Sequence, residues 1–295
     1  MKIIVDSMGS DKGPQEIIKG AVDGINELGV EIVLVGEENI IKKELSKYTY
    51  PKNSIEIINA EQIISNEDEP VLAIRRKKKS SMVLGLEALT NGRGDGFVST
   101  GNTGALLAGG LFIVKRIEGI ERAALATVYP TKKGISFILD VGANVDSKPE
   151  YLMQFATMGS IYAEKVLGIK SPTVGLANIG VEEGKGNALV RDSYKLLSNS
   201  NLNFIGNVEI RDIPEGIVDI IVCDGFVGNV ILKLTEGIAI TMFSTLKEEF
   251  ESSFKSKIGA LMLKPQLKSF KNRLDYREYG GAPLLGLKKP VVKAH

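Results

Sequence analysis

Short apolar runs rich in β-branched residues alternate along the chain with stretches in which apolar residues recur every three or four positions. The first pattern is typical of buried strands and the second of amphipathic helices. In the first helical stretch, Pro14 stands where a first-turn proline is tolerated. Six apolar residues then recur on one helical face: Ile17, Ile18, Ala21, Val22, Ile25 and Leu28. The strands predicted in the same way are residues 2–6, 31–36, 54–58, 96–99, 123–129, 135–140, 173–178, 203–208 and 217–223.

The order of these elements predicts the fold class. Several strands are apolar without alternation, as expected of strands that helices cover on both faces. Strands separated by crossover helices form a mostly parallel sheet, so we expect a three-layer, doubly wound α/β fold. Because no repeat, low-complexity tract or linker interrupts residues 1–295, a single domain is favoured. Ligands of such folds bind beyond the carboxyl ends of the strands, so the functional residues should lie in the loops that begin there.

The segment 250–278 has a different pattern. Between Lys255 and Arg277 it holds seven basic residues and one acidic residue, and the apolar residues 258–263 and Pro265 interrupt them. We expect this segment to protrude as a basic helical hairpin with an apolar tip.

Composition narrows the possible function classes. The 295 residues are 43% hydrophobic and 25% charged, which is typical of a globular protein. No apolar run approaches the roughly 20 residues that cross a bilayer, and the N-terminus lacks a signal-peptide pattern, so we expect a cytoplasmic protein. A formal net charge of +1 provides no global field for binding nucleic acid. The basic run 75–79 is either a solvated helix face or a contact for an acidic protein or a phosphate.

The chain holds one cysteine, Cys223, and one histidine, His295. These counts exclude a disulfide framework, a zinc site of usual composition and a nucleophile paired with an internal histidine. Cys223 ends an apolar run, so we interpret it as a small buried hydrophobe rather than a nucleophile. Catalysis must therefore use lysine, asparagine, aspartate, backbone amides or groups of the substrate.

Five strand ends open into loops rich in glycine, asparagine and aspartate: residues 6–14, 99–104, 140–146, 178–187 and 224–229. Glycine lets the backbone approach a ligand, and a following helix offers unpaired N–H groups to an anion. Taken singly, each loop is more often a tight turn than a site, but together they favour phosphate binding. Neither a P-loop nor a dinucleotide-binding glycine motif is present.

Particular polar residues in these loops have two interpretations. Lys185 lies between two glycines and is either a solvated loop lysine or the cation of a phosphate site, and we favour the second. For Asn144 and Asn187, helix capping or turn formation is the simpler explanation. Asn102 and Asn229, beside glycines near helix starts, are candidates to donate to a carbonyl oxygen as charge develops on it.

Taken in order, the loops resemble those of the PlsX-type phosphate acyltransferases. The resemblance covers essentially the whole chain and rests on six segments: 6–11 (DSMGSD), 100–107 (TGNTGALL), 139–146 (LDVGANVD), 185–187 (KGN), 223–230 (CDGFVGNV) and 279–286 (YGGAPLLG). The chain departs from the family at Ser10, where a second glycine is usual, and at Gly184, where a threonine is usual.

The resemblance implies a homodimeric enzyme with the isopropylmalate-dehydrogenase-like fold. Such an enzyme transfers a long-chain acyl group reversibly from acyl carrier protein to inorganic phosphate, and it needs no cofactor or metal. The acyl phosphate then serves a membrane glycerol-3-phosphate acyltransferase in phospholipid synthesis. Members of the family usually continue past residues 293–295 into a final helix, so we expect that helix to be missing here.

With this reaction in mind, we expect Lys185 to hold the phosphate and Asn229 or Asn102 to face the carbonyl. Asp224 would orient the surrounding loops. The remaining residues expected to bind phosphate or substrate are Asp6, Gly9, Gly101, Thr103, Gly104, Asp140, Asn144, Asn187 and Gly228.

The hairpin has candidate duties of its own. Its apolar residues Leu261, Met262 and Leu263 would dip into an anionic membrane surface. Its basic residues Lys268, Lys271, Arg273 and Arg277 would grip the acidic carrier protein. A dimer contact is the alternative to both.

Three rival functions stay open at this stage. One is a metal- and NAD-dependent dehydrogenase of the same fold, and a second is a non-enzymatic scaffold that binds phosphate or a lipid surface. The third is a phosphate acyltransferase that uses short-chain acyl-CoA.

Overall fold

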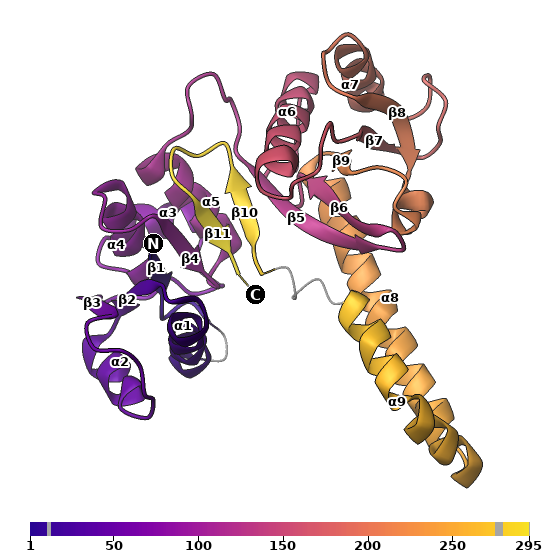
Figure 1. The fold of residues 1–295 in the computed structure, drawn as a ribbon. Coiled ribbons are helices and arrows are strands. Elements are labelled where there is room, and N and C mark those ends of the chain that lie inside the picture. Colours follow the sequence, from indigo (N-terminus) through magenta and orange to yellow (C-terminus); the bar gives the residue numbers. More distant parts are fainter. Residues whose placement is uncertain (11–12, 275–279, 295) are drawn as a thin grey trace. The chain divides into compact units, whose positions relative to one another are not determined.

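The computed structural model describes residues 1–10, 13–274 and 280–294 (Figure 1). The chain divides into two compact units, Met1–Ala123 with Gly281–His295, and Ala124–Gly280. The single domain expected over residues 1–295 stays a prediction, and each unit is described by itself.

The first unit contains a mostly parallel sheet with the strand order β3-β2-β1-β4-β11-β10. Its strands are β1 (Lys2–Asp6), β2 (Glu31–Gly36), β3 (Ile55–Asn59), β4 (Gly96–Ser99), β10 (Ala282–Leu285) and β11 (Val291–Lys293). Its helices are α1 (Pro14–Leu28), α2 (Glu38–Leu45), α3 (Pro70–Arg76), α4 (Ser81–Thr90) and α5 (Thr103–Gly109), which continues into a π-helical turn, η1 (Gly110–Val114). Among the described strands of this unit, only β10 runs antiparallel to its neighbour β11; the pairs β1–β2, β2–β3, β1–β4 and β4–β11 are parallel.

Helix α1 shows how the sequence pattern builds this unit. Pro14 is its first residue, as predicted, and Ile18, Val22 and Ile25 are buried against β2. Leu28, predicted on the same helical face, has a side chain that is 74% exposed. Leu28 is the last residue of the helix, and Gly29 then turns the chain away with φ 65°.

The second unit contains a sheet with the order β5-β6-β9-β7-β8. Its strands are β5 (Ala124–Thr131), β6 (Gly134–Leu139), β7 (Val174–Asn178), β8 (Phe204–Glu209) and β9 (Ile220–Val222). Helices α6 (Pro149–Lys165) and α7 (Ala188–Ser198) and a 3-10 turn, η2 (Ile210–Glu215), connect them. The pairs β6–β9, β9–β7 and β7–β8 are parallel, whereas β5 and β6 form an antiparallel hairpin.

The predicted fold class, a mostly parallel α/β sheet, is confirmed. Each of the nine predicted strands is present, although β9 is shorter than predicted. Strands β10 and β11 were missed. The β5–β6 hairpin is antiparallel because only Lys132 and Lys133 separate its ends, too few residues for a crossover.

Two long helices, α8 (Gly225–Glu251) and α9 (Phe254–Leu274), form a hairpin that extends from the second sheet (Figure 1). Phe243 of α8 and Phe270 of α9 pack with their ring centroids 6.0 Å apart. The hairpin is longer than the predicted segment 250–278, because α8 begins at Gly225. Residues 275–278 of that segment lie outside the described part of the chain.

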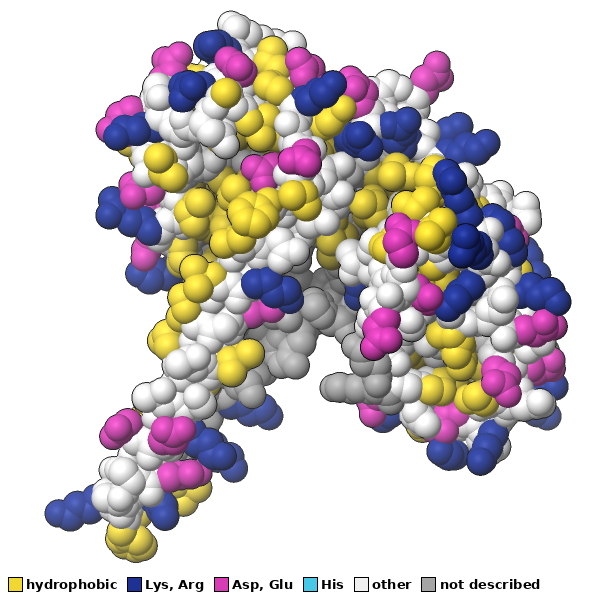
Figure 2. All heavy atoms as spheres, turned by 180° about the vertical axis from the view of Figure 1, so that it is seen from behind, with side chains coloured by type: hydrophobic (Ala, Val, Ile, Leu, Met, Phe, Trp, Pro, Cys, Tyr) yellow, Lys and Arg dark blue, Asp and Glu magenta, His cyan; other side chains and the backbone are white. Residues whose placement is uncertain are grey.

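Helix α8 is long and apolar enough to cross a membrane by length and composition alone, and 11% of its most apolar window is buried. In the sequence, α8 does not stand out as an uninterrupted apolar run, because Lys233 and Glu236 interrupt it. These two side chains pair with each other, Nζ to Oε2, at 3.0 Å. Figure 2 shows apolar side chains spread along the hairpin.

Candidate functional site

In the first unit, the loops that follow β1 and β4 lie against each other, because these strands are parallel neighbours. A Cβ atom at Gly9 would lie 2.8 Å from the backbone nitrogen of Gly101, so only glycine fits at this contact. The buried carboxylate of Asp6 connects the loops: it accepts from the Ser99 hydroxyl at 2.7 Å and from the Met8 N–H at 3.2 Å. Burial raises the pKa of Asp6, and these hydrogen bonds oppose the shift.

Asn102 is the N-cap of α5. Its Oδ1 accepts from the Ala105 N–H at 3.0 Å. Its Nδ2 donates to the carbonyl oxygens of Ser65, Asn66 and Asp68 at 3.2, 3.3 and 3.2 Å. Three carbonyls therefore compete for the two amide hydrogens, and capping accounts for Asn102 without a role at a substrate carbonyl.

Two further predicted residues begin α5. Thr103 is exposed at the first helical position. Gly104 lies against α3, since a Cβ atom there would be 2.7 Å from Cγ of Pro70. Close packing of α3 on α5 is therefore a structural reason for glycine at position 104.

In the second unit, the fully buried Asp140 folds the loop 140–146 around its side chain. Its carboxylate accepts hydrogen bonds from the backbone N–H groups of Leu125, Gly142, Ala143 and Asn144 and from the side-chain amide of Asn144, at 2.6 to 3.3 Å. Burial raises the pKa of Asp140, and these donors oppose the shift. Asp140 and Asn144 thus hold the loop from within.

The start of α8 is fastened to this loop. Asp224 caps the helix by accepting from the Val227 N–H at 2.9 Å, and the Gly225 N–H donates to the Asn144 carbonyl at 2.7 Å. A Cβ atom at Gly228 would lie 1.9 Å from the Asp140 carbonyl oxygen, so glycine is required there. The predicted orienting role of Asp224 thus has a physical basis in the helix cap.

Asn229 differs from the other predicted asparagines. It is exposed near the start of α8, and its Nδ2 lies over the loop, 3.1 Å from where a Cβ atom of Gly142 would stand. Within the described part of the chain its side chain has no hydrogen-bond partner. Its amide is therefore the one of the two oxyanion candidates that has free donors.

Lys185 stands on the loop that joins β7 to α7. The side chain of Asn178 braces this loop: Nδ2 donates to the Lys185 carbonyl at 3.2 Å, and Oδ1 accepts from the Ile179 N–H at 2.8 Å. The Lys185 side chain is exposed and forms no ion pair with any described residue. Asn187 caps α7 through the Val190 N–H at 3.0 Å, as the simpler explanation predicted.

Strand order brings the residues of the second unit together. Because β6, β9 and β7 are parallel neighbours, the loops 140–146, 224–229 and 179–187 leave the same edge of the sheet (Figure 1). Asp140, Asn229 and Lys185 therefore belong to one edge. In the first unit, Asp6, Gly9 and the loop 100–102 share an edge for the same reason.

One residue beside these loops was missed. Lys293 ends β11, and its Nζ donates to the carbonyls of Thr100 at 3.1 Å and Ala294 at 2.6 Å. The sequence around it gave no strand signal, since β11 has three residues and follows Pro290. Its position is set by pairing with β4, a contact remote in sequence.

Cys223 is buried, as predicted. Its Sγ lies 3.5 Å from the Asp140 carbonyl oxygen, and burial together with the neighbouring carboxylates of Asp140 and Asp224 raises the thiol pKa well above its usual range. A thiol in this environment stays protonated and is a poor nucleophile.

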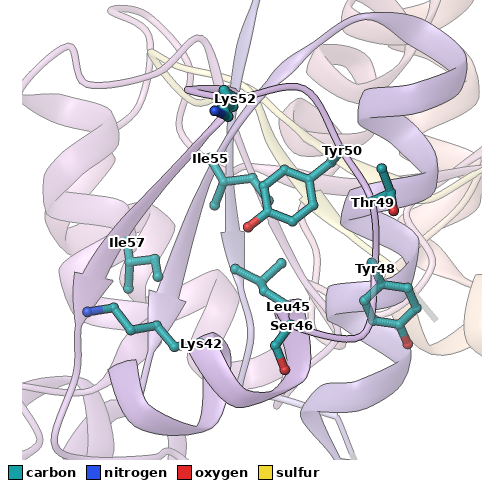
Figure 3. A pocket seen from close by; sticks show the side chains of 9 residues that line it. All are labelled: Lys42, Leu45, Ser46, Tyr48, Thr49, Tyr50, Lys52, Ile55 and Ile57. Carbon is teal, nitrogen blue, oxygen red and sulfur yellow. The ribbon is translucent and has the colours of Figure 1, made fainter.

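A surface pocket of about 550 Å³ lies elsewhere in the first unit, between α2 and β3 (Figure 3). Its lining residues are Lys42, Leu45, Ser46, Tyr48, Thr49, Tyr50, Lys52, Ile55 and Ile57. None of the predicted site residues is among them. The pocket adjoins the segment that enters β3, whereas the candidate loops leave the other ends of the parallel strands.

The basic run 75–79 is partly engaged within the first unit. Lys77 pairs with Asp68, Nζ to Oδ2, at 2.6 Å, and Lys79 pairs with Glu61 at 2.9 Å. The Arg75 guanidinium lies 5.5 Å from the ring centroid of Phe112. These contacts explain part of the run without a ligand.

In the helical hairpin, Leu261, Met262 and Leu263 are exposed, and so is Lys268. The prediction that residues 258–263 form the tip was wrong, because they lie within α9 and the turn is at residues 252–253. The side chains of Lys271 and Arg273, and all of Arg277, are outside the described part of the chain.

Comparisons with known proteins add sequence and fold similarities to this geometry. A family described as "Fatty acid synthesis protein" matches residues 1–295. The chain is 57% identical over 295 residues to a phosphate acyltransferase of Alkaliphilus oremlandii, covering 100% of this chain and 88% of the relative. It is 51% identical over 296 residues to a phosphate acyltransferase of Clostridioides difficile, covering 100% and 87%. Among solved structures, a phosphotransacetylase from Streptococcus pyogenes shares the fold, with a TM-score of 0.61 and 18% identity over 81% of this chain and 82% of that one.

Proposed function

The chain belongs to the phosphate acyltransferase family, and we propose that it transfers a long-chain acyl group from acyl carrier protein to inorganic phosphate. The transfer is reversible, and the acyl phosphate feeds a membrane glycerol-3-phosphate acyltransferase. The fatty acid synthesis family supports a fatty acyl group rather than a short one. The observation that carries the proposal is the edge of the second sheet, where Lys185 and Asn229 each present a side chain without a partner among the described residues.

The reaction needs no protein nucleophile. A phosphate oxygen attacks the thioester carbonyl carbon, the new C–O bond forms, and the C–S bond breaks to release the carrier thiolate, which takes up a proton. The protein must supply proximity and donors for the oxyanion, effects of about 7–11 and 3–4 kcal/mol in well-built sites. The buried, protonated Cys223 has no part in these steps.

Lys185 holds the phosphate in this proposal. Its ammonium is exposed and forms no ion pair with the described carboxylates, so its charge is available to an anion.

Asn229 donates to the carbonyl oxygen as negative charge develops on it. Asp224 and Asp140 position it, because the first caps the helix that carries Asn229 and the second holds the loop beneath it. Asn102 is not needed in this role, since its amide is already bonded to backbone carbonyls.

The partners follow from the same proposal. The enzyme is a cytoplasmic homodimer that associates peripherally with an anionic membrane surface through the α8–α9 hairpin. The exposed apolar residues and Lys268 on α9 support this contact, and the basic end of the hairpin meets the acidic carrier protein.

Substitution of the lysine tests the site. Lys185→Ala should raise the KM for phosphate about 10- to 100-fold, the loss expected for a charge-assisted hydrogen bond, while circular dichroism stays unchanged. Lys170→Ala is the matched control, because Lys170 is also exposed but lies before β7, at the opposite edge. Kinetics for Lys185→Ala that equal those of the control would refute the assignment.

A further inference from the structure

Large apolar side chains stand exposed around Lys185 and Asn229. Ile179 is 74% exposed, Val181 63%, Val145 61% and Phe226 61%. A single exposed hydrophobe is ordinary on a protein surface. These four, however, belong to the three loops that leave one edge of the second sheet, and an apolar group beside a candidate site indicates a binding surface.

Ile179 and Val181 flank the backbone on which the stem of Lys185 lies. A Cβ atom at Gly180, between them, would be 3.5 Å from Cγ and 3.8 Å from Cδ of Lys185, and it would be 2.9 Å from the Glu182 carboxylate. The loop is braced at both ends of this stretch: Asn178 Oδ1 accepts from the Ile179 N–H, and Asn207 Nδ2 donates to the Glu182 carbonyl at 2.9 Å. The two apolar side chains are thus held next to the ammonium-bearing chain.

Val145 and Phe226 are the other two exposed apolar residues, and they lie on the segments that follow β6 and β9. The hydrogen bond from the Gly225 N–H to the Asn144 carbonyl joins the residues that directly precede them in sequence. They therefore lie on neighbouring segments, beside Asn229 near the start of α8.

We propose that Ile179, Val181, Val145 and Phe226 contact methylenes of the donor's acyl chain that a short acyl group lacks, and that Ile179 and Val181 set the preference for long chains. This inference rests on the proposed function. An acyl chain must leave the thioester carbonyl beside the phosphate, and its methylenes gain about fourfold in binding for each one fully removed from water. The exposed apolar residues next to Lys185 and Asn229 are placed to remove that water.

Chain-length dependence tests the inference. The ratio of kcat/KM for a palmitoyl donor to that for a butyryl donor, both on the same carrier protein, is measured for Ile179→Thr/Val181→Thr. These substitutions keep the β-branch and exchange apolar for polar surface, so the ratio should fall about tenfold or more. Val166→Asn is the matched control, because Val166 is 61% exposed but ends α6, at the opposite edge of the sheet. The control should keep the wild-type ratio.

A second pair of substitutions, Val145→Thr and Phe226→Ser, repeats the measurement on the other loops. If all variants lower kcat/KM equally for both donors, or if they change the molar mass of the enzyme instead of the ratio, these residues are covered by protein and the inference is wrong. If the wild-type enzyme forms no acyl phosphate from either donor, the proposed function itself has failed, which is a different result.

Discussion

Asn102 and Asn229 each stand beside a glycine at the start of a helix, yet their amides have different surroundings. The Asn102 amide is buried and bonded to backbone carbonyls of the segment that leads into α3. The Asn229 amide is exposed at the edge that carries Lys185. Removing the two side chains should therefore affect different properties, turnover for Asn229 and stability for Asn102.

Asn229→Ala should lower kcat about 10²- to 10³-fold, the usual loss when an oxyanion donor is removed, with little change in unfolding free energy. Asn102→Ala should instead cost about 1–3 kcal/mol of stability, because it removes a helix cap and leaves buried carbonyls unpaired. Steady-state kinetics and urea denaturation of both variants measure the contrast. A stable Asn102→Ala enzyme with kcat reduced as far as that of Asn229→Ala would reverse the assignment.

The buried carboxylate of Asp6 should make the stability of the protein depend on pH. Its pKa is raised in the folded state, so its stabilising contribution is complete below the unfolded value near 3.8 and is lost as pH rises through the folded pKa. Asp6→Asn removes this titration. The stability of the wild-type protein relative to Asp6→Asn should therefore decline as pH rises above about 4, measured by urea denaturation at each pH. A difference that grows with pH would contradict the raised pKa.

In the candidate loops, the sequence predicts which loops follow the strands but not the hydrogen bonds of each side chain. The free ammonium of Lys185 and the cap formed by Asp224 follow from local features, a glycine-flanked lysine and an aspartate before a helix. The hydrogen bonds of the Asn102 amide do not follow from local features, because its partners are 34 to 37 residues away in the sequence. Lys293 escaped prediction for the same reason.

At the scale of elements, strands with strong local patterns were predictable, and strands defined by their neighbours were not. β1 and β2 are β-branched runs that match their predicted bounds. β10 and β11 have only four and three residues, and β10 contains Pro283. They become strands because β11 pairs with β4. The local sequence pattern does not indicate this pairing.

The hairpin of α8 and α9 yields a prediction at this scale. Leu261→Asp/Leu263→Asp should abolish flotation of the enzyme with anionic liposomes, because it replaces two exposed apolar side chains of α9 with charges. Phosphate-dependent turnover of a soluble acyl donor should persist in the variant. Leu28→Asp, an exposed leucine on α1, is the control. Undiminished flotation of the double variant would remove α9 from the membrane contact.

At the scale of the whole molecule, α8 carries apolar side chains that are exposed within the described part of the chain. Leu234, Ile238 and Met242 recur at intervals of four, so they lie along one stripe, and each is more than half exposed. Such a stripe on a long helix indicates a contact with another molecule. A second copy of the chain is the occupant that the homodimer proposal requires, whereas a lipid surface is the competing one.

Charge introduced on this stripe separates the two occupants. Leu234→Lys/Ile238→Lys should convert the proposed dimer to a monomer at micromolar concentration, because burying two unpaired ammonium groups in an apolar interface costs more than such an interface gains. Sedimentation equilibrium gives the molar mass, and Leu28→Lys in the other unit controls for the added charge. An unchanged dimer whose liposome flotation is lost would assign the stripe to lipid. A monomer that still floats would assign α8 to the subunit contact and leave membrane binding to α9.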